Sequence, residues 1–528
     1  MAVVGAGFAG MYMLHRIREL GLAVAVFERG SDVGGTWYWN RYPGARCDVE
    51  SLEYSYGFDA ELQQEWQWTE RYSAQPEILA YAKHVADRFE LRSDIEFNTT
   101  VTAAQWDESG GRWQVDVDGP NGTRVVSSRF VVMATGCLSS VNKPQFAGLD
   151  QFAGRLFHTG EWPHEPVDFT GRRVGVVGTG SSAVQAIPEI AQQCRQLTVF
   201  QRTATYSVPA RNEPLDPVYE QQVKSSYEEF RAANRAQNSA FGAWSDHNLS
   251  PYAAYEPDEQ LQMLERGWDI GGFRFARSFG DMALDKSTND AHRRFVVDKI
   301  RSTVDDPETA ELLSPTHVIG CKRLCLDSHY FETYNLDHVS LCDIKSNPIV
   351  SFDAAGVELS DGTRIDLDDV VMATGFDAMT GTVLRMDIRG VNGATLREQW
   401  QHGPRTYLGL MVPRFPNMFL ITGPGSPSVL TNMIVAIEQH VEWITRCVAD
   451  MESEGLSVID TTEEEADGWV AHVNAVADRT LMPSCNSWYV GANVEGKPRV
   501  FMPLIGFPDY SRTCDDVAVD GYRGFVRH

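Results

Sequence analysis

Two glycine-rich segments constrain the fold of this 528-residue chain more than any other feature. Each follows a short apolar run and precedes a stretch with helical spacing: GAGFAG at Gly5–Gly10, with glycines Gly5, Gly7 and Gly10, and GTGSSA at Gly178–Ala183, with Gly178, Gly180, Ser181, Ser182 and Ala183. In a strand–turn–helix unit the first glycine makes the tight turn, and the second lets the backbone approach a pyrophosphate. Amide groups at the helix N-terminus then bind the phosphates. The pair predicts an α/β fold with two Rossmann-like dinucleotide-binding domains.

The residues that end the partner strands predict which dinucleotide each unit binds. In the first unit, the expected strand Leu22–Phe27 ends in Glu28, whose carboxylate can accept hydrogen bonds from ribose hydroxyls. In the second unit, the expected strand Leu197–Phe200 is followed by Arg202 and Thr203 rather than an acid. An arginine and a hydroxyl bind a 2′-phosphate, which a carboxylate would repel. We therefore expect FAD in the first unit and NADP(H) in the second.

The order of segments predicts a discontinuous first domain. Two apolar strands are expected at Val131–Met133 and Val370–Met372, and each is followed by Ala-Thr-Gly. Such paired exits suit crossings of the chain between two nucleotide domains. Residues 211–315 are rich in Glu, Gln, Arg and Ala with helical spacing. We expect an FAD-binding domain at 1–140 and 379–528, a linker and NADP-binding domain at 141–210 and 316–378, a helical insertion in that second domain at 211–315, and a mobile loop near 485–500.

Composition excludes several classes of function. The formal net charge of −26 argues against nucleic-acid binding, which needs clustered cations. There is no run of eighteen apolar residues, so no membrane span is expected. None of the nine cysteines forms C-x-x-C, which predicts neither a dithiol redox motif nor a zinc site, and no metal is expected. Only four residues precede Gly5, which leaves a short first strand and no room for a signal peptide. We expect a cytoplasmic monomer.

The stretch between the two glycine segments indicates the chemistry. It matches F-x-G-x-x-x-H-x-x-x-W-P at Phe152, Gly154, His158, Trp162 and Pro163. With GGTWYWNRYPGARCD at 34–48, the pair at 322–323 and SWYVGAN at 487–493, it resembles the type I flavin-dependent Baeyer–Villiger monooxygenases over essentially the whole chain. The resemblance implies that NADPH reduces FAD, that O2 then forms a C4a-peroxyflavin, and that a ketone becomes an ester or lactone.

The resemblance also implies roles for individual residues. Arg323 matches the catalytic arginine of the family. Asp48 matches a carboxylate near the flavin, which can orient Arg323. Lys322 matches a residue that reaches the 2′-phosphate, and Trp488 matches a loop tryptophan that contacts NADP. Leu430 and Met433 match the substrate walls. Further flavin-site residues implied by the likeness are Gly35, Thr36, Trp37 and Tyr54.

Several alternatives remain at this point. Asp48 could instead pair with Arg41 or Arg46, and His158 could be a hydrogen-bonded hinge residue rather than a catalytic one. Related flavin monooxygenases oxidise sulfur or nitrogen but usually lack the Trp162-Pro163 ending. A pyridine nucleotide–disulfide oxidoreductase needs a cysteine pair, and a non-catalytic flavoprotein would not need Asp48, Lys322, Arg323 and Trp488 together.

Overall fold

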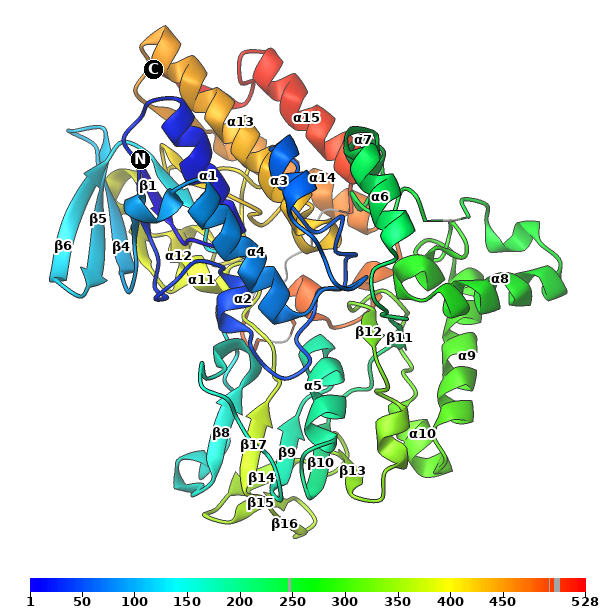
Figure 1. Cartoon of the computed structure of the whole chain (residues 1–528). Coiled ribbons are helices and arrows are strands. Elements are labelled where there is room, and N and C mark those ends of the chain that lie inside the picture. The colour runs from blue at the N-terminus through cyan, green and yellow to red at the C-terminus, as the bar shows by residue number, and fades with distance from the viewer. Residues whose placement is uncertain (246–247, 493, 498–503) are drawn as a thin grey trace.

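The structure, a computed structural model, describes residues 1–245, 248–492, 494–497 and 504–528. Two parallel five-stranded sheets form the centres of two units, which are the upper and lower parts of Figure 1. Each sheet begins with a buried apolar strand that runs into a glycine turn and a helix. The first helix is α1 (Phe8–Glu19) and its counterpart is α5 (Ser181–Ala191).

The first unit contains the sheet with the order β19-β7-β1-β2-β3. Its strands are β1 (Ala2–Val4), β2 (Ala25–Phe27), β3 (Ile95–Glu96), β7 (Val131–Met133) and β19 (Met418–Leu420). A four-stranded sheet packs on it, made of β4 (Thr100–Asp107), β5 (Arg112–Gly119), β6 (Gly122–Ser128) and β18 (Asp387–Arg389). The accompanying helices are α2 (Thr36–Trp39), α3 (Ala60–Glu65), α4 (Gln75–Arg88), α11 (Gly381–Leu384), α12 (Leu396–Gln399), α13 (Met433–Glu454), α14 (Glu463–Ala477) and α15 (Phe507–Val519). A short ribbon, β20 (Ile459–Thr461) with β21 (Phe525–Arg527), closes the C-terminal part.

The second unit contains the sheet with the order β13-β10-β9-β17-β8. Its strands are β8 (Arg155–His158), β9 (Arg173–Val177), β10 (Gln196–Gln201), β13 (Val339–Asp343) and β17 (Asp369–Met372). A small antiparallel sheet, β14 (Ile349–Phe352), β15 (Gly356–Leu359) and β16 (Arg364–Asp366), lies below it in Figure 1. A two-stranded ribbon, β11 (Ser207–Pro209) and β12 (Cys325–Asp327), continues the chain beyond β10 toward the first unit.

The helical segment between β11 and β12 contacts both units. Its helices are α6 (Pro217–Ser225), α7 (Tyr227–Arg235), α8 (Pro257–Ile270), α9 (Lys286–Thr303) and α10 (Pro307–Leu313). Val223 of α6 and Phe230 of α7 are buried in the core of the first unit, and Arg235 at the end of α7 pairs with Glu438 of α13. Leu264, Phe295 and Leu313, from the last three helices, are buried in the core of the second unit. The segment therefore bridges the two units, which its composition does not indicate.

One strand differs from its sequence-based prediction. The strand expected at Leu22–Phe27 begins only at Ala25, because its partner β1 has three residues and the register pairs Ala2 with Ala25. Before that point Leu22 hydrogen-bonds back to Ile17 in a turn that closes α1. The short β1 is nevertheless fully paired on both sides and almost completely buried. Among the described residues, none of the helices has both the length and the apolar surface that crossing a bilayer requires.

Candidate active site

The first glycine segment forms a tight backbone cradle. Gly5 has a φ of +102°, and a Cβ at this position would lie 2.7 Å from the carbonyl oxygen of Ala134 at the exit of β7. A Cβ on Gly10 would lie 1.8 Å from the Gly5 oxygen. Gly7 and Gly35 face each other so closely that a Cβ on Gly35 would lie 2.8 Å from the Gly7 Cα. The bare backbone at these positions fits a close approach to a dinucleotide pyrophosphate.

Glu28 follows β2 beside this cradle. Its side chain is 5% exposed, and its two carboxylate oxygens accept hydrogen bonds from the Ala6 amide at 2.7 Å and the Gly30 amide at 2.6 Å. Each oxygen retains a further lone pair that a ribose hydroxyl can use. The backbone bonds hold the carboxylate against the GAGFAG turn, which is the geometry the nucleotide pattern requires.

The other residues expected in the flavin site lie beside the same turn. Gly35, with a φ of +53°, starts the short helix α2, and Thr36 and Trp37 form its first turn. The Trp37 indole donates a hydrogen bond to the Tyr54 hydroxyl at 3.2 Å, and the two rings meet edge to face. These four residues are therefore held as one group next to Gly7.

The second glycine segment repeats the first. Gly178 has a φ of +113°, and a Cβ there would lie 2.5 Å from the Ala373 oxygen at the exit of β17, just as Gly5 meets Ala134. A Cβ on Gly180 would meet no atom within 4 Å, so the space in front of the start of α5 is open. Ser181 and Ser182 are half-buried at this helix start, and Ala183 is buried in the core. The open space fits a second dinucleotide.

Two cations stand beside this second cradle. Arg202 and Thr203 follow β10 and are exposed, and Lys322 is half-buried. Burial lowers the pKa of Lys322, and the positive charge of Arg202 lowers it further. Neither of them has an acidic partner among the described residues. Two such cations fit the binding of a dianion, as the sequence predicts for a 2′-phosphate.

Arg323 and Asp48 form a two-point ion pair that joins the units. The Arg323 Nε donates to one Asp48 oxygen at 2.7 Å, and Nη2 donates to the other at 2.7 Å. Its Nη1 donates to the carbonyl oxygen of Val429 at 2.7 Å. The alternative partners of Asp48 are engaged elsewhere, since Arg46 pairs with Glu70 and Arg41 donates to a backbone carbonyl. The guanidinium is thus fixed by bonds to two segments of the first unit.

The surroundings of Arg323 preserve its charge. Burial alone would lower its pKa, but the charge of Asp48, their paired hydrogen bonds and a hydrogen bond with Tyr489 together raise the pKa above its ordinary value. Phe273 lies beneath the guanidinium, 5.4 Å from ring centre to Cζ. Burial raises the pKa of Tyr489, so its hydroxyl stays protonated. Arg323 therefore remains cationic at any working pH.

A pocket of about 370 Å³ adjoins the ion pair. Asp48 and Phe273, which both contact Arg323, form part of its wall, and Tyr72, Phe241 and Trp244 supply aromatic surface. A volume in this range suits a small organic molecule. Because the wall combines residues 48–53 and 71–72 with the helical segment, the pocket lies where that segment meets the first unit.

The expected substrate walls lie in a neighbouring apolar cluster rather than on that pocket. Leu430 and Met433 pack with Trp488 and the buried residues Val429 and Tyr489. Arg323 contacts this cluster through the Val429 carbonyl. The structure thus brings the predicted substrate and loop residues together beside Arg323. Asn493 and residues 498–500, which belong to the loop expected near 485–500, lie outside the described residues.

The F-x-G-x-x-x-H-x-x-x-W-P stretch lies in the second unit, where it contains the edge strand β8. His158 ends β8 and is buried, and its ring nitrogens contact Thr374 and Asn142 on one side and the Gly160 amide on the other. Burial lowers its pKa, so the ring is neutral. Trp162 stacks on Phe157, and Phe152 packs in the core of the second unit. His158 is thus a buried, hydrogen-bonded residue, as the hinge alternative requires.

Two further features of the site were missed by sequence reasoning. Tyr489 was hidden inside a segment noted only for its neighbour Trp488. A disulfide joins Cys321 to Cys485, which the absence of C-x-x-C spacing did not lead us to expect. The two are separated by 164 positions, and no short spacing could have signalled the pair.

Comparison with known proteins agrees with this architecture. The profile of the flavin-binding monooxygenase-like family matches residues 1–230. A Baeyer-Villiger monooxygenase of Pseudooceanicola batsensis is 41% identical, with 99% of this chain and 95% of that protein covered. A phenazine N-monooxygenase of Lysobacter antibioticus is also 41% identical, over 100% and 96%. The solved structure of an oxidised steroid monooxygenase bound to NADP matches with a TM-score of 0.93 and 50% identity, covering 100% of this chain and 98% of that one.

The fold and the site define a monooxygenase with two nucleotide-binding units, one for a flavin and one for NADP(H). The chain belongs to the type I flavin-dependent Baeyer–Villiger monooxygenases. The family, the fold class, the FAD and NADP(H) cofactors and the monooxygenase activity expected from the sequence are confirmed.

Proposed function

We propose that this enzyme inserts one oxygen atom from O2 next to the carbonyl of a small ketone, giving an ester or a lactone, with Arg323 as the catalytic residue. The observation that carries the proposal is the two-point Arg323–Asp48 pair, which stands beside a pocket of about 370 Å³. Oxygen insertion into a ketone develops negative charge on the carbonyl oxygen. A fixed cation in a site shielded from water stabilises such charge far more than solvent does.

Each polar neighbour of Arg323 has a role in this proposal. Asp48 takes two donors and so fixes the plane of the guanidinium, while the Val429 carbonyl takes a third. An arginine has five N–H donors, so two remain for the reacting oxygen atoms and for Tyr489. Asp48 is therefore the positioning residue, and Arg323 supplies the charge.

The two glycine cradles and their neighbours would hold the cofactors. FAD, when bound, accepts hydride from NADPH and supplies the oxygen chemistry. In the first unit Gly5, Gly7, Gly35 and Glu28 fit its pyrophosphate and ribose. In the second unit the start of α5 fits the pyrophosphate of NADP(H), and Arg202 and Lys322 bind its 2′-phosphate. Thr203 adds a hydroxyl at the same edge.

Trp488 and its apolar neighbours keep water from this site. The Trp488 ring lies against Tyr489, which itself bonds to Arg323, and both join the cluster that contains Leu430 and Met433. A closed apolar cover over a fixed cation excludes water during turnover. Leu430 and Met433 do not line the 370 Å³ pocket, and in this proposal they form the apolar cover on the other side of Arg323.

A substrate panel tests the proposal. Purified enzyme, NADPH and air are supplied with linear, cyclic and aryl-alkyl ketones, with sulfides and with amines, and the products are identified by mass spectrometry. Ketone products heavier by one oxygen atom, formed in step with NADPH oxidation, are expected. One relative is named for N-oxidation. If only amines or sulfides gave oxygenated products, the proposed ketone oxygenation would be refuted and heteroatom oxidation would be the function.

A further inference from the structure

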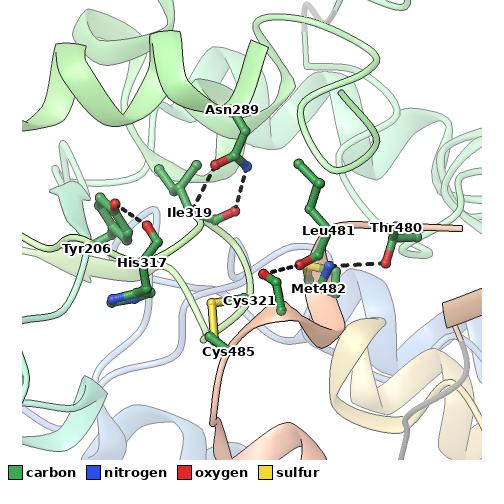
Figure 2. Close-up of a disulfide and its surroundings, with 10 residues drawn as sticks. Tyr206, Asn289, His317, Ile319, Cys321, Thr480, Leu481, Met482 and Cys485 are labelled. Carbon is green, nitrogen blue, oxygen red and sulfur yellow. Dashed lines mark hydrogen bonds between the residues drawn. A yellow bond between two sulfur atoms is a disulfide. The ribbon is translucent and has the colours of Figure 1, made fainter. Parts of the chain in front are cut away.

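The Cys321–Cys485 disulfide joins two segments that carry expected active-site residues. Cys321 stands two positions before Arg323, and Cys485 stands three positions before Trp488. The bond therefore runs from the turn before β12 to the segment between α14 and α15 (Figure 2). Cys321 is completely buried and Cys485 is half-buried.

The Cys321 end of the bond is firmly anchored. Asn289 of α9 receives a hydrogen bond from the Ile319 amide at 3.1 Å and donates one to the Ile319 carbonyl at 3.0 Å. The Tyr206 hydroxyl donates to the His317 carbonyl at 2.5 Å. Figure 2 shows these contacts on both sides of the loop that leads into Cys321. The segment before Lys322 and Arg323 is thus fixed to the second unit and to the helical segment.

The Cys485 end is anchored at points away from the Arg323 turn. The Leu481 amide donates to the Ala283 carbonyl at 2.9 Å, and Lys497 pairs with Asp377. Between these points, the backbone hydrogen bonds of residues 487–492 are internal, from Val490 and Ala492 back to Ser487. Besides the disulfide, side-chain packing and the Tyr489 contact join the Trp488 turn to the Arg323 turn.

We propose that the Cys321–Cys485 bond is a redox-controlled link that positions the Trp488 segment over the Lys322–Arg323 turn, so that its closed form couples NADPH oxidation to oxygen insertion. The proposal rests on the roles assigned above to Lys322, Arg323 and Trp488. In the closed form the cover over the cation cannot separate from it by more than the disulfide allows. In the dithiol form the cover opens more often, water enters, and more O2 is reduced to hydrogen peroxide.

The oxidant that closes the link is a peroxide, and the uncoupled reaction itself supplies one. When oxygen is not inserted, NADPH, a proton and O2 give NADP+ and H2O2. One thiol of the pair attacks H2O2, forming a sulfenic acid and releasing water. The second thiol then attacks that sulfur, forming the S–S bond and releasing a second water, so two thiols and one H2O2 give one disulfide and two waters. Peroxide from the uncoupled reaction therefore forms the disulfide, and the disulfide in turn limits further release of peroxide.

The wild-type enzyme in its two redox states provides the first test, because it needs no mutation. Full-length holoenzyme is prepared with a phosphine reductant or with one equivalent of H2O2, and alkylation followed by intact mass counts the free thiols. Peroxide released per NADPH, KM for NADPH and kcat for a ketone are then measured without reductant. We expect the peroxide fraction to rise about fivefold in the dithiol form, at the low end of coupling between linked sites. KM for NADPH should rise, while hydride transfer at saturating NADPH stays unchanged.

Cysteine variants provide the second test. Cys321→Ser and Cys485→Ser should each resemble the reduced enzyme and no longer respond to reductant or peroxide. Cys342→Ser is the matched control: it removes a half-buried free thiol on β13 and should keep the full redox response. Equal peroxide fractions and equal KM values in verified disulfide and dithiol forms would overturn the proposal. Absence of ester in both forms would overturn the proposed function instead, and a redox-dependent rate of NADPH oxidation would still support the link.

Discussion

Replacing Asp48 by Asn is the sharpest test of how the catalytic cation is positioned. The change keeps the shape of the side chain but removes the charge and one of two acceptors. The Asn oxygen can accept from either Nε or Nη2 of Arg323, but the Asn amide group then faces the other donor. One of the two 2.7 Å bonds is therefore lost and the other becomes a weaker neutral-acceptor bond.

The size of the effect follows from this geometry. A charge-assisted bond is about twice as strong as a neutral one, and breaking a fully buried pair costs about 3–5 kcal/mol. Arg323 and Asp48 are 22% and 24% exposed, so water compensates part of the loss. We expect oxygen insertion to lose about 2–3 kcal/mol of stabilisation, which is about 30- to 150-fold in kcat for ester formation.

The assay separates this step from the others. Stopped-flow reduction by NADPH and the FAD content should stay close to those of the wild type, whereas ester formed per NADPH should fall. Asp467→Asn is the matched control, because Asp467 accepts the Nε and Nη2 of Arg405 at 2.7 Å each in the same two-point geometry at an exposed site. Ester formation at the wild-type rate in Asp48→Asn would refute the positioning role of Asp48.

Four further changes test other parts of the site. Arg202→Ala should raise KM for NADPH about tenfold or more but leave KM for NADH little changed, since one charge-assisted phosphate contact is lost. Equal effects on both nucleotides would show that Arg202 does not bind the 2′-phosphate. Gly180→Ala should fold and bind FAD normally, because nothing lies within 4 Å of the new Cβ, yet weaken NADPH binding measured by titration; unchanged affinity would mean that this space is not the nucleotide site. Trp488→Ala should raise the peroxide released per NADPH, and an unchanged ratio would exclude the cover role. Burial raises the pKa of Glu53 from 4.5 to about 8, so the folded state retains a proton that the unfolded state loses, and the free energy of unfolding should fall as pH rises from about 4.5 through about 8. Glu53→Gln should lessen this fall in denaturant titrations. An unaltered pH profile would contradict the assigned protonation.

The nucleotide sites are the part of the structure that the sequence predicts best. Gly5 and Gly178 can be predicted from the sequence because a strand that turns sharply past a neighbouring carbonyl has no room for a Cβ. Glu28 and Arg202 stand at fixed positions after the partner strands, so the roles proposed for them follow from the local pattern. Local rules therefore determine both cradles.

The contacts that complete the site depend on long-range packing. Asp48 and Arg323 are 275 positions apart, and their pairing was expected only through resemblance to a family. Tyr489, Phe273 and the Cys321–Cys485 bond had no signal at all, because each depends on how the helical segment and the C-terminal segment fold back on the turn before β12. The late start of β2 has the same origin, since the length of its partner determines where pairing begins.

The β11–β12 ribbon connects the two segments that carry Arg202 and Arg323. Arg202 precedes one of its strands and Arg323 precedes the other, and Ser207 is paired directly with Cys325. The cation proposed to bind the 2′-phosphate and the cation proposed to be catalytic therefore lie on segments that one ribbon joins. If the second unit swung away from the first as a rigid body, both Arg323–Asp48 bonds would break, so the proposed catalytic pair exists only while the two units are docked.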